Sequence, residues 1–202
     1  MKKLLFATSN ADKIRELREM MEPCGYEVLG MAQAGVAVDV EETGETFAEN
    51  ALQKARAVHA LTGSLVLADD SGLVVDAMGG EPGVHSARWM GHETSYDIKN
   101  AEILRRLEGL EGPARSARYI CAIAAVLPDG RELVEEAAME GCIAHTPAGT
   151  HGFGYDPIFF LPQFGRTSAE LEPDEKNQIS HRGKAMRAMR DRLERMNREA
   201  GL

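Results

Sequence analysis

The chain has 202 residues, 44% of them hydrophobic, and a formal net charge of -9 at pH 7. This length suits one sizeable domain or two small lobes, and the acidic balance argues against a general nucleic-acid-binding protein. No apolar stretch approaches the roughly 20 residues that cross a bilayer, and the apolar start ends at Ala7, which is too short for a signal peptide.

The first quarter of the chain alternates between strand and helix patterns. Apolar residues at helical spacing, Ile14, Leu17 and Met20, predict an amphipathic helix. Thr46 and Glu49 resemble a capping box at the start of a second helix. In chain order, we expect a strand over 3–7, a helix over 12–22, a strand over 26–29 and a helix from Thr46 to about Leu61.

Two adjacent acids, Asp69 and Asp70, follow the apolar run 65–68. Like charges in a partly dry site raise each other's pKa, so such a pair persists most easily beside a cation or hydrogen-bond donors. Because Gly72 lets the backbone turn, we expect a kink there between two strand-like segments. Neighbouring side chains of a strand point to opposite faces, so Asp69 is expected to support Asp70 from the other face. The alternative is a surface turn in which Asp caps backbone N–H groups.

The rest of the chain predicts a mixed α/β domain spanning residues 1–202. A long hairpin indicates a partly antiparallel sheet and a second lobe, and a cleft between lobes would be the natural ligand site. We expect a strand over 73–77, a helix over 95–107, hairpin strands over 118–127 and 132–143, a glycine-rich loop over 146–157, and a last helix opened by Ser180 with a core-facing methionine stripe. The three cysteines are odd in number and widely spaced, which fits a reducing cytoplasm.

Two segments before the acid pair are candidates for binding phosphate and metal. The first lies at a helix start, where free N–H groups attract anions; its members are Thr8, Ser9, Asn10, Ala11, Asp12 and Lys13. The alternative for it is an ordinary helix cap with a solvated lysine. In the second, Glu41 or Glu42 would join Asp70 on a magnesium ion, although acids also favour a helix N-terminus for structural reasons alone.

Two later segments are candidates for reading a base. In the run 149–157, Phe153 and Tyr155 can offer a flat apolar face and Asp156 an acceptor, unless the loop is only a tight connection. His181 and Arg182 fall in the first turn of the last helix, where the dipole disfavours cations, so an anionic or electron-rich partner should compensate. The alternative there is a solvated charged face.

In this order and spacing, the segments resemble the inosine triphosphate pyrophosphatase family, also described as XTP/dITP diphosphatases. The resemblance runs from Thr8 through Arg182. The segments that carry it are Thr-Ser-Asn-Ala-Asp-Lys, Glu-Thr-Gly-Glu-Thr-Phe-Ala-Glu-Asn-Ala, Ala-Asp-Asp-Ser-Gly-Leu, Pro-Gly-Val-His-Ser-Ala-Arg, Gly-Phe-Gly-Tyr-Asp-Pro and Ile-Ser-His-Arg-Gly. One departure is His151, where the family usually has glycine.

The resemblance implies an elongated α/β fold of two lobes with a central cleft, a homodimer, and magnesium-dependent hydrolysis of ITP, dITP and XTP to the monophosphate and pyrophosphate. It implies that Asp70 is the general base and a metal ligand, and that Ser71 contacts substrate. Residues 8–13 would hold the phosphates, and the nucleotide and its base would be bound by Phe153, Gly154, Tyr155, Asp156, Lys176, His181 and Arg182. Lys13 and Lys54 would add positive charge for the leaving pyrophosphate.

Two rival functions stay open at this point. One is a Maf-like pyrophosphatase acting on modified nucleotides, against which the Ser-His-Arg and Gly-Phe-Gly-Tyr-Asp segments argue. The other is a non-catalytic nucleotide-binding protein, which would leave Asp70 and its partners unused. No nucleic-acid or membrane partner is expected.

Overall fold

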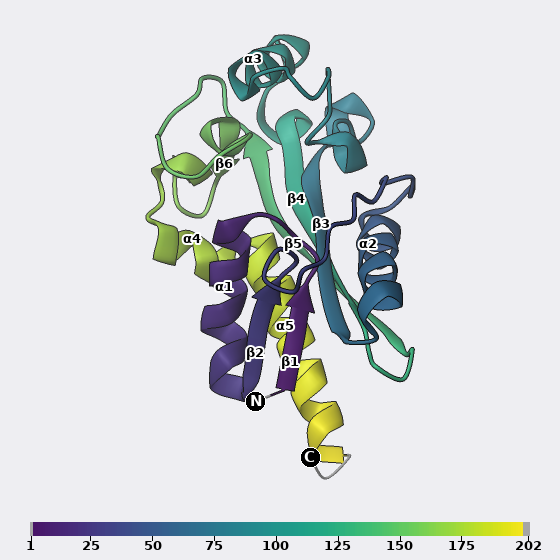
Figure 1. Ribbon diagram of the computed structural model, residues 1–202. Helices are drawn as coiled ribbons and strands as arrows, with labels where there is room; N and C mark the ends of the chain where they lie inside the picture. Colours follow the sequence, from purple (N-terminus) through teal and green to yellow (C-terminus); the bar gives the residue numbers. More distant parts are fainter. Residues whose placement is uncertain (1, 200–202) are drawn as a thin grey trace. The chain divides into compact units, whose positions relative to one another are not determined.

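The computed structural model describes residues 2–199, apart from the side chain of Asp12. Its α-helices are α1 (Ala11–Met21), α2 (Phe47–Thr62), α3 (Tyr96–Arg106), α4 (Pro173–Ile179) and α5 (His181–Glu199) (Figure 1). Its strands are β1 (Lys2–Phe6), β2 (Tyr26–Gly30), β3 (Leu65–Val75), β4 (Ser116–Val126), β5 (Glu132–Ile143), β6 (Phe159–Leu161) and β7 (Arg166–Thr167).

The strands form one mixed sheet in the order β2-β1-β3-β4-β5-β6-β7. β1 pairs in parallel with both β2 and β3, whereas β5, β6 and β7 pair antiparallel. β4 and β5 are neighbours joined by a short turn, closed where the Leu127 N–H donates to Arg131 O at 2.9 Å. The predicted hairpin and the mixed α/β class are therefore confirmed.

The chain divides into two compact units. Unit 1 holds residues up to 70, 121–137 and those from 184 onward, and unit 2 holds 71–120 and 138–183. Strands β3, β4 and β5 contribute residues to both units. Each unit is described separately below.

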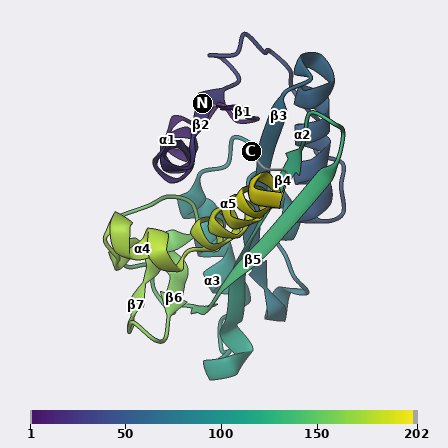
Figure 2. The ribbon, with the colours of Figure 1, turned by 90° about the horizontal axis from the view of Figure 1, so that it is seen from below.

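Unit 1 is a sheet with helices on both faces. Leu4 and Phe6 of β1 share one core with α1 and with the methionine stripe of α5, so the predicted inward stripe is confirmed. Leu5 between them points to the other face. Figure 2 shows α2 on one side of β3 and α1 with α5 on the other. The predicted capping box of α2 is present, because Thr46 Oγ1 accepts from the Glu49 N–H at 3.1 Å and Glu49 accepts from the Thr46 N–H at 3.2 Å.

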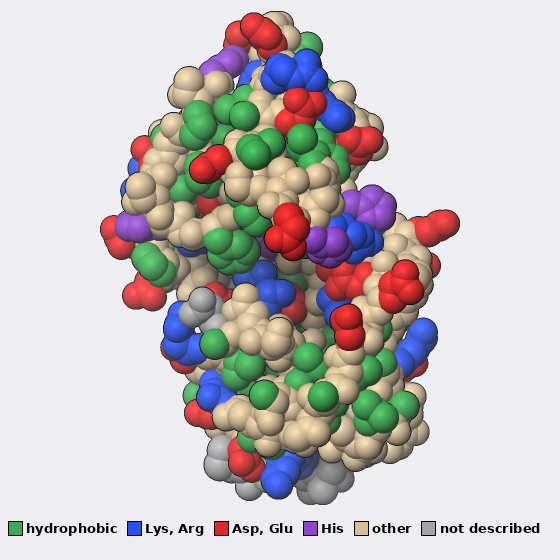
Figure 3. Space-filling model, turned by 45° about the horizontal axis from the view of Figure 1, so that its top comes forward, with side chains coloured by type: hydrophobic (Ala, Val, Ile, Leu, Met, Phe, Trp, Pro, Cys, Tyr) green, Lys and Arg blue, Asp and Glu red, His purple; other side chains and the backbone are tan. Residues whose placement is uncertain are grey.

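Unit 2 has its own core. Ile103 and Leu107 pack from α3 and its end against Phe159 and Leu161 of β6 and Tyr119 of β4. On the face drawn in Figure 3, acidic and basic side chains are interspersed with hydrophobic ones. None of the described helices is long and apolar enough to cross a membrane.

The expected kink at the acid pair is wrong, because β3 runs without interruption from Leu65 to Val75. Gly72 is buried and does not have a positive φ. A turn is unnecessary because side chains from other elements meet both carboxylates while the strand stays extended.

Three short elements were not predicted: β6, β7 and α4. Two of them are strands of three and two residues, which is too short for an alternating pattern. The helix α4 has seven residues, and its N-cap residue, Glu172, makes no side-chain capping bond. It ends at Ser180, whose Oγ accepts from the Gly183 N–H at 3.0 Å and so opens α5 as predicted.

Candidate active site

Strand alternation decides the partners of the two adjacent acids. Asp69 has the parity of Leu65 and Leu67, which pack in the core with α1, and its Oδ2 accepts from Lys13 Nζ at 2.7 Å. Asp70 faces α2, where its Oδ2 accepts from Asn50 Nδ2 at 3.1 Å and its Oδ1 lies 3.7 Å from Lys54 Nζ. The predicted division of the pair between opposite faces is confirmed.

These partners form what we call the charged cluster: Lys13, Glu42, Lys54, Asp69 and Asp70 of unit 1. Burial raises the pKa of Asp70 to about 6, with Glu42 and Asp69 adding to the rise while Lys54 and Asn50 oppose it. Burial alone would lower the pKa of Lys54, but Asp70, Asp69 and Glu42 outweigh it and the net pKa is raised. The cluster therefore pairs a permanent cation with a carboxylate that exchanges its proton near neutral pH.

The structure separates the two candidate metal glutamates. Glu42 Oε1 accepts from Lys54 Nζ at 2.7 Å, and that ammonium also faces Asp70. Glu41 is exposed on the segment before α2. Two carboxylates already converge on one cation, which fits a magnesium ion that takes a few carboxylates and completes its shell with water and phosphate oxygens. Among the described residues, no group of three or more potential metal ligands occurs.

A pocket of about 210 Å³ in unit 1 adjoins the charged cluster. It is lined by Thr8, Ser9, Lys13, Glu42, Lys54 and Asp69 together with Ala7, Met31, Val38, Asp39, Val40 and Val58. Of the residues predicted to bind phosphate, Thr8, Ser9 and Lys13 therefore line this pocket. The wall from 31 to 40 was missed, because it lies outside regular strands and helices and carries no recognisable pattern.

The other members of the 8–13 segment have different positions. Asn10 caps α1, since its Oδ1 accepts from the Lys13 N–H at 3.2 Å. Ala11 is the exposed first residue of α1, and the side chain of Asp12 lies outside the described residues. The predicted helix start is confirmed, and both the capping and the pocket interpretations apply to parts of it.

Unit 2 holds the second set of predicted residues, in what we call the glycine loop (149–157). Asp156 Oδ2 accepts from the Phe153 N–H at 2.9 Å and from Lys176 Nζ at 2.5 Å. The Phe153 ring is 63% exposed, and Lys176 Nζ lies 5.8 Å from its centroid. An exposed aromatic face beside a buried acid and a lysine suits the stacking and hydrogen bonding of a flat heterocycle.

Two predicted base-binding side chains are buried instead. Tyr155 is only 3% exposed, and its hydroxyl donates to Ser86 O at 2.7 Å. The expectation that it offers a flat face with Phe153 is therefore wrong in this structure. His181 stacks on Tyr119 with ring centroids 4.8 Å apart. Phe153 and Tyr155 lie on either side of Gly154, where the backbone turns at a φ of +71°, so the first ring is exposed while the second is buried.

Glycine is required where the loop touches its surroundings. A Cβ at Gly152 would lie 2.2 Å from Asp156 Oδ2, and one at Gly149 would lie 2.3 Å from the Ala169 backbone. His151 anchors the loop, with Nδ1 2.9 Å from Leu171 O. The remaining predicted contacts, Ser71 on β3 and Arg182 in the first turn of α5, are both half-buried.

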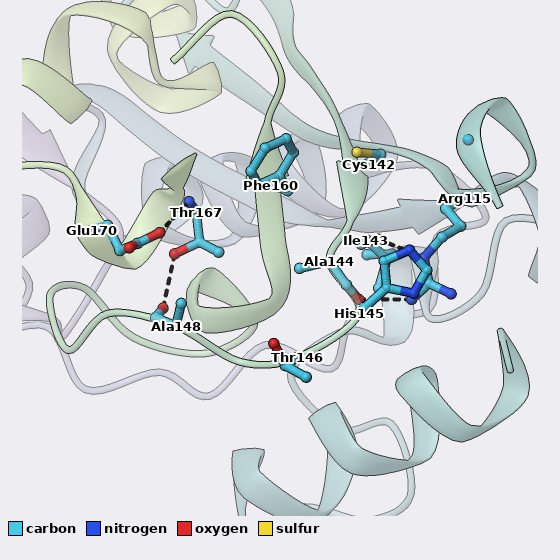
Figure 4. Close-up of a pocket in the computed structure, with 11 residues that line it drawn as sticks. Arg115, Cys142, Ile143, Ala144, His145, Thr146, Ala148, Phe160, Thr167 and Glu170 are labelled. Carbon is cyan, nitrogen blue, oxygen red and sulfur yellow. Dashed lines mark hydrogen bonds between the residues drawn. The ribbon is translucent and has the colours of Figure 1, made fainter. Parts of the chain in front are cut away.

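A second pocket of about 380 Å³ lies in unit 2 and was not predicted (Figure 4). In its wall, the buried guanidinium of Arg115 donates to Ile143 O at 2.7 Å and Ala144 O at 2.7 Å. Thr167 donates to Ala148 O at 2.8 Å, just before the glycine loop. The lining also holds the free thiol of Cys142 and the carboxylate of Glu170, which accepts from the Thr167 N–H at 2.7 Å.

Comparisons with known proteins show which family this chain is similar to. The model of the Ham1 family matches residues 4–192. A dITP/XTP pyrophosphatase of Geobacillus kaustophilus is 50% identical over 195 residues, covering 96% of this chain and 95% of that protein. The dITP/XTP pyrophosphatase of Bacillus subtilis is 44% identical over 194 residues, covering 96% and 98%. The Ham1 protein of Staphylococcus aureus superposes with a TM-score of 0.89 at 38% identity, covering 96% of this chain and 98% of that one.

Proposed function

The chain belongs to the Ham1 family, and from that premise we propose that it hydrolyses purine nucleoside triphosphates with a non-standard base: ITP, dITP and XTP. The products are the nucleoside monophosphate and pyrophosphate. One observation carries the chemistry: Asp70, a buried carboxylate with its pKa raised to about 6, shares the ammonium of Lys54 with Glu42. The curated relatives at 44% to 50% identity are named dITP/XTP pyrophosphatases.

The charged cluster performs the phosphate chemistry in this proposal. Asp70 orients the attacking water and takes its proton on a carboxylate oxygen, for which a pKa near the working pH is favourable. Lys13 and Lys54 offset the negative charge that builds on the leaving pyrophosphate. A magnesium ion held by Asp70 and Glu42 would make that water more acidic and neutralise phosphate charge.

The glycine loop performs the recognition. Phe153 stacks on the purine, and Asp156 accepts from a ring N–H while Lys176 and Arg182 supply donors; His181, stacked on Tyr119, supports them from behind. Hypoxanthine and xanthine carry a 6-oxo acceptor where adenine carries a 6-amino donor. A buried donor left facing the wrong group costs on the order of 1–3 kcal/mol, so two such contacts give large discrimination.

We propose that residues 1–202 form one nucleotide pyrophosphatase domain in which both sets of residues act on the same nucleotide, with Ser71 and residues 8–13 beside the phosphates. We also propose a homodimer in the cytoplasm, in line with the resemblance of the sequence. Light scattering on the purified protein tests the dimer separately from the activity.

A pyrophosphate-release assay tests the function. The substrates are ITP, dITP, XTP, GTP, ATP and a modified pyrimidine triphosphate, each with magnesium and with EDTA. We expect release from the first three, little from ATP, and none with EDTA. Equal rates on ATP would refute the base selection, preferential turnover of the pyrimidine would favour the Maf-like alternative, and binding without release would indicate a non-catalytic protein. The matched control is Asp70→Asn, which keeps the size of the side chain.

A further inference from the structure

Two adjacent residues on α3, Lys99 and Asn100, are buried although both are polar. Lys99 is 1% exposed and Asn100 is 5% exposed. The first donates from Nζ to Ala87 O at 2.8 Å and lies 4.9 Å from the Tyr96 ring centroid. The second donates from Nδ2 to Gly154 O at 3.1 Å. One turn of one helix thus reaches two segments that are far apart in the sequence.

Both segments lead to the glycine loop. Gly154 is part of it, directly between Phe153 and Tyr155. Ala87 follows Ser86, whose carbonyl accepts from the Tyr155 hydroxyl at 2.7 Å. The Tyr155 ring also meets Tyr96 edge-to-face, with centroids 5.2 Å apart. The loop is therefore held from α3 by two routes, one direct and one through Ser86.

Ser86 also connects the glycine loop to β3, the strand that carries Asp70. Ser86 Oγ accepts from the N–H of Leu73 at 2.9 Å and donates to Gly83 O at 2.6 Å. Leu73 is three residues beyond Asp70 on β3. Within unit 2, a chain of hydrogen bonds thus runs from β3 through Ser86 to Tyr155. Lys99 holds Ala87, the residue next to Ser86.

Each of the two polar groups also introduces an unfavourable feature into the core of unit 2. Within residues 2–199, the ammonium of Lys99 has no acidic partner, and burying a charge against only a carbonyl and a ring is unfavourable. The Oδ1 atom of Asn100 is buried without a hydrogen-bond partner in the same part of the chain, which is also unfavourable. The amide cannot simply be reversed, because Gly154 O needs a donor.

We propose that Lys99 and Asn100 are positioning residues for purine binding: by holding Ala87 and Gly154 they fix the glycine loop, and they set affinity and selectivity for the base without touching the reacting phosphates. This proposal rests on the proposed function. It assigns a role to a lysine-asparagine pair that carries none of the phosphate or metal chemistry.

The test compares Asn100→Leu and Lys99→Met with Ile98→Ala, a change at a 55% exposed position on the same helix. Each variant is measured for kcat and KM on ITP, for the ratio of kcat/KM on ITP to that on GTP, and for thermal melting. We expect Asn100→Leu to raise KM for ITP about tenfold and Lys99→Met about fivefold. Both should lower the ITP-to-GTP ratio while kcat stays within twofold and Tm within a few degrees. Ile98→Ala should match the wild type in every measurement.

Two results would overturn the proposal. One is KM within twofold of wild type in both variants. The other is a melting temperature lowered by ten degrees or more, or a loss of folded protein, because either outcome assigns the pair to the fold. Failure of the proposed function is separate and is visible in the wild type, which would then release no pyrophosphate from ITP at all.

Discussion

The charged cluster of unit 1 and the glycine loop of unit 2 are built by opposite means. The cluster consists of side chains on β3, α2 and α1, with Glu42 from the segment before α2, that neutralise one another, as in the Lys13–Asp69 and Lys54–Glu42 pairs at 2.7 Å. The loop is irregular backbone held by Asn100 of α3 and by its own His151, which reaches the Leu171 carbonyl. In the proposed function, the phosphate chemistry would therefore lie mostly on regular elements, while base recognition would lie on an irregular loop.

The largest expected effect is a loss of catalytic rate, without loss of nucleotide binding, when Asp70 is replaced. Asp70→Asn should lower kcat on dITP by about 10²–10⁴-fold at saturating magnesium, the usual range for losing general acid–base catalysis. The measurement is steady-state pyrophosphate release, with nucleotide binding followed by calorimetry as control. Near-normal turnover would remove Asp70 from the proposed mechanism.

The second effect tests whether the ion pair between Lys13 and Asp69 stabilises the folded protein. Lys13→Met removes the cation from Asp69, whose side chain is only 2% exposed, and should lower the free energy of unfolding by about 2–4 kcal/mol. The double variant Lys13→Met/Asp69→Asn should recover most of that loss. Urea denaturation of both variants measures the free energy of unfolding. An equal loss of stability in the single and the double variant would contradict the pairing.

The third effect concerns pH in the metal-free protein. Because the folded-state pKa of Asp70, about 6, lies above its ordinary value of 3.8, the folded protein holds this proton more tightly than the unfolded chain. This group therefore contributes stability below about pH 4 that is lost as pH rises through 6. In EDTA at pH 8, the free energy of unfolding of Asp70→Asn should therefore be about 1–3 kcal/mol larger than that of the wild type.

That gap should close as the pH falls toward 4, because a protonated Asp70 resembles asparagine in charge. Comparing the two proteins at each pH cancels the contributions of the other titrating groups, which they share. A gap that stays constant from pH 8 to pH 4 would show that the carboxylate does not titrate in this range.

The smallest expected effect tests the loop. Phe153→Ala removes a ring that is 63% exposed, so stability should change by less than about 0.5 kcal/mol. Loss of stacking, worth about 1–3 kcal/mol per base, should raise KM for ITP about tenfold with kcat nearly unchanged. An unchanged KM would exclude Phe153 from base binding.

Sequence patterns predicted the elements that are long and periodic. The helices α1, α2, α3 and α5 and the β4–β5 hairpin follow from spacing, caps and turn residues. The alternation of Asp69 and Asp70 was also predictable, because it depends only on the geometry of an extended chain.

Tertiary contacts decided what the sequence could not. Gly72 permits a turn, and only the pairing of β3 shows that none is made. Tyr155 and Phe153 look alike in sequence, yet one is buried beneath Ser86 and the other is exposed. That Glu42 meets Lys54 depends on a residue twelve positions away on α2, which the acidic run alone does not reveal.

The unbroken course of β3 limits how this site can change over evolution. Both acids take their partners from strand parity, so inserting or deleting one residue between Leu65 and Ala68 would exchange their faces. The residue aimed at Lys54 would then be aimed at Lys13, although the composition of the segment had hardly changed. Single insertions and deletions should therefore be absent from this stretch in active relatives, whereas the chain between β2 and α2, which has no such parity, can vary in length.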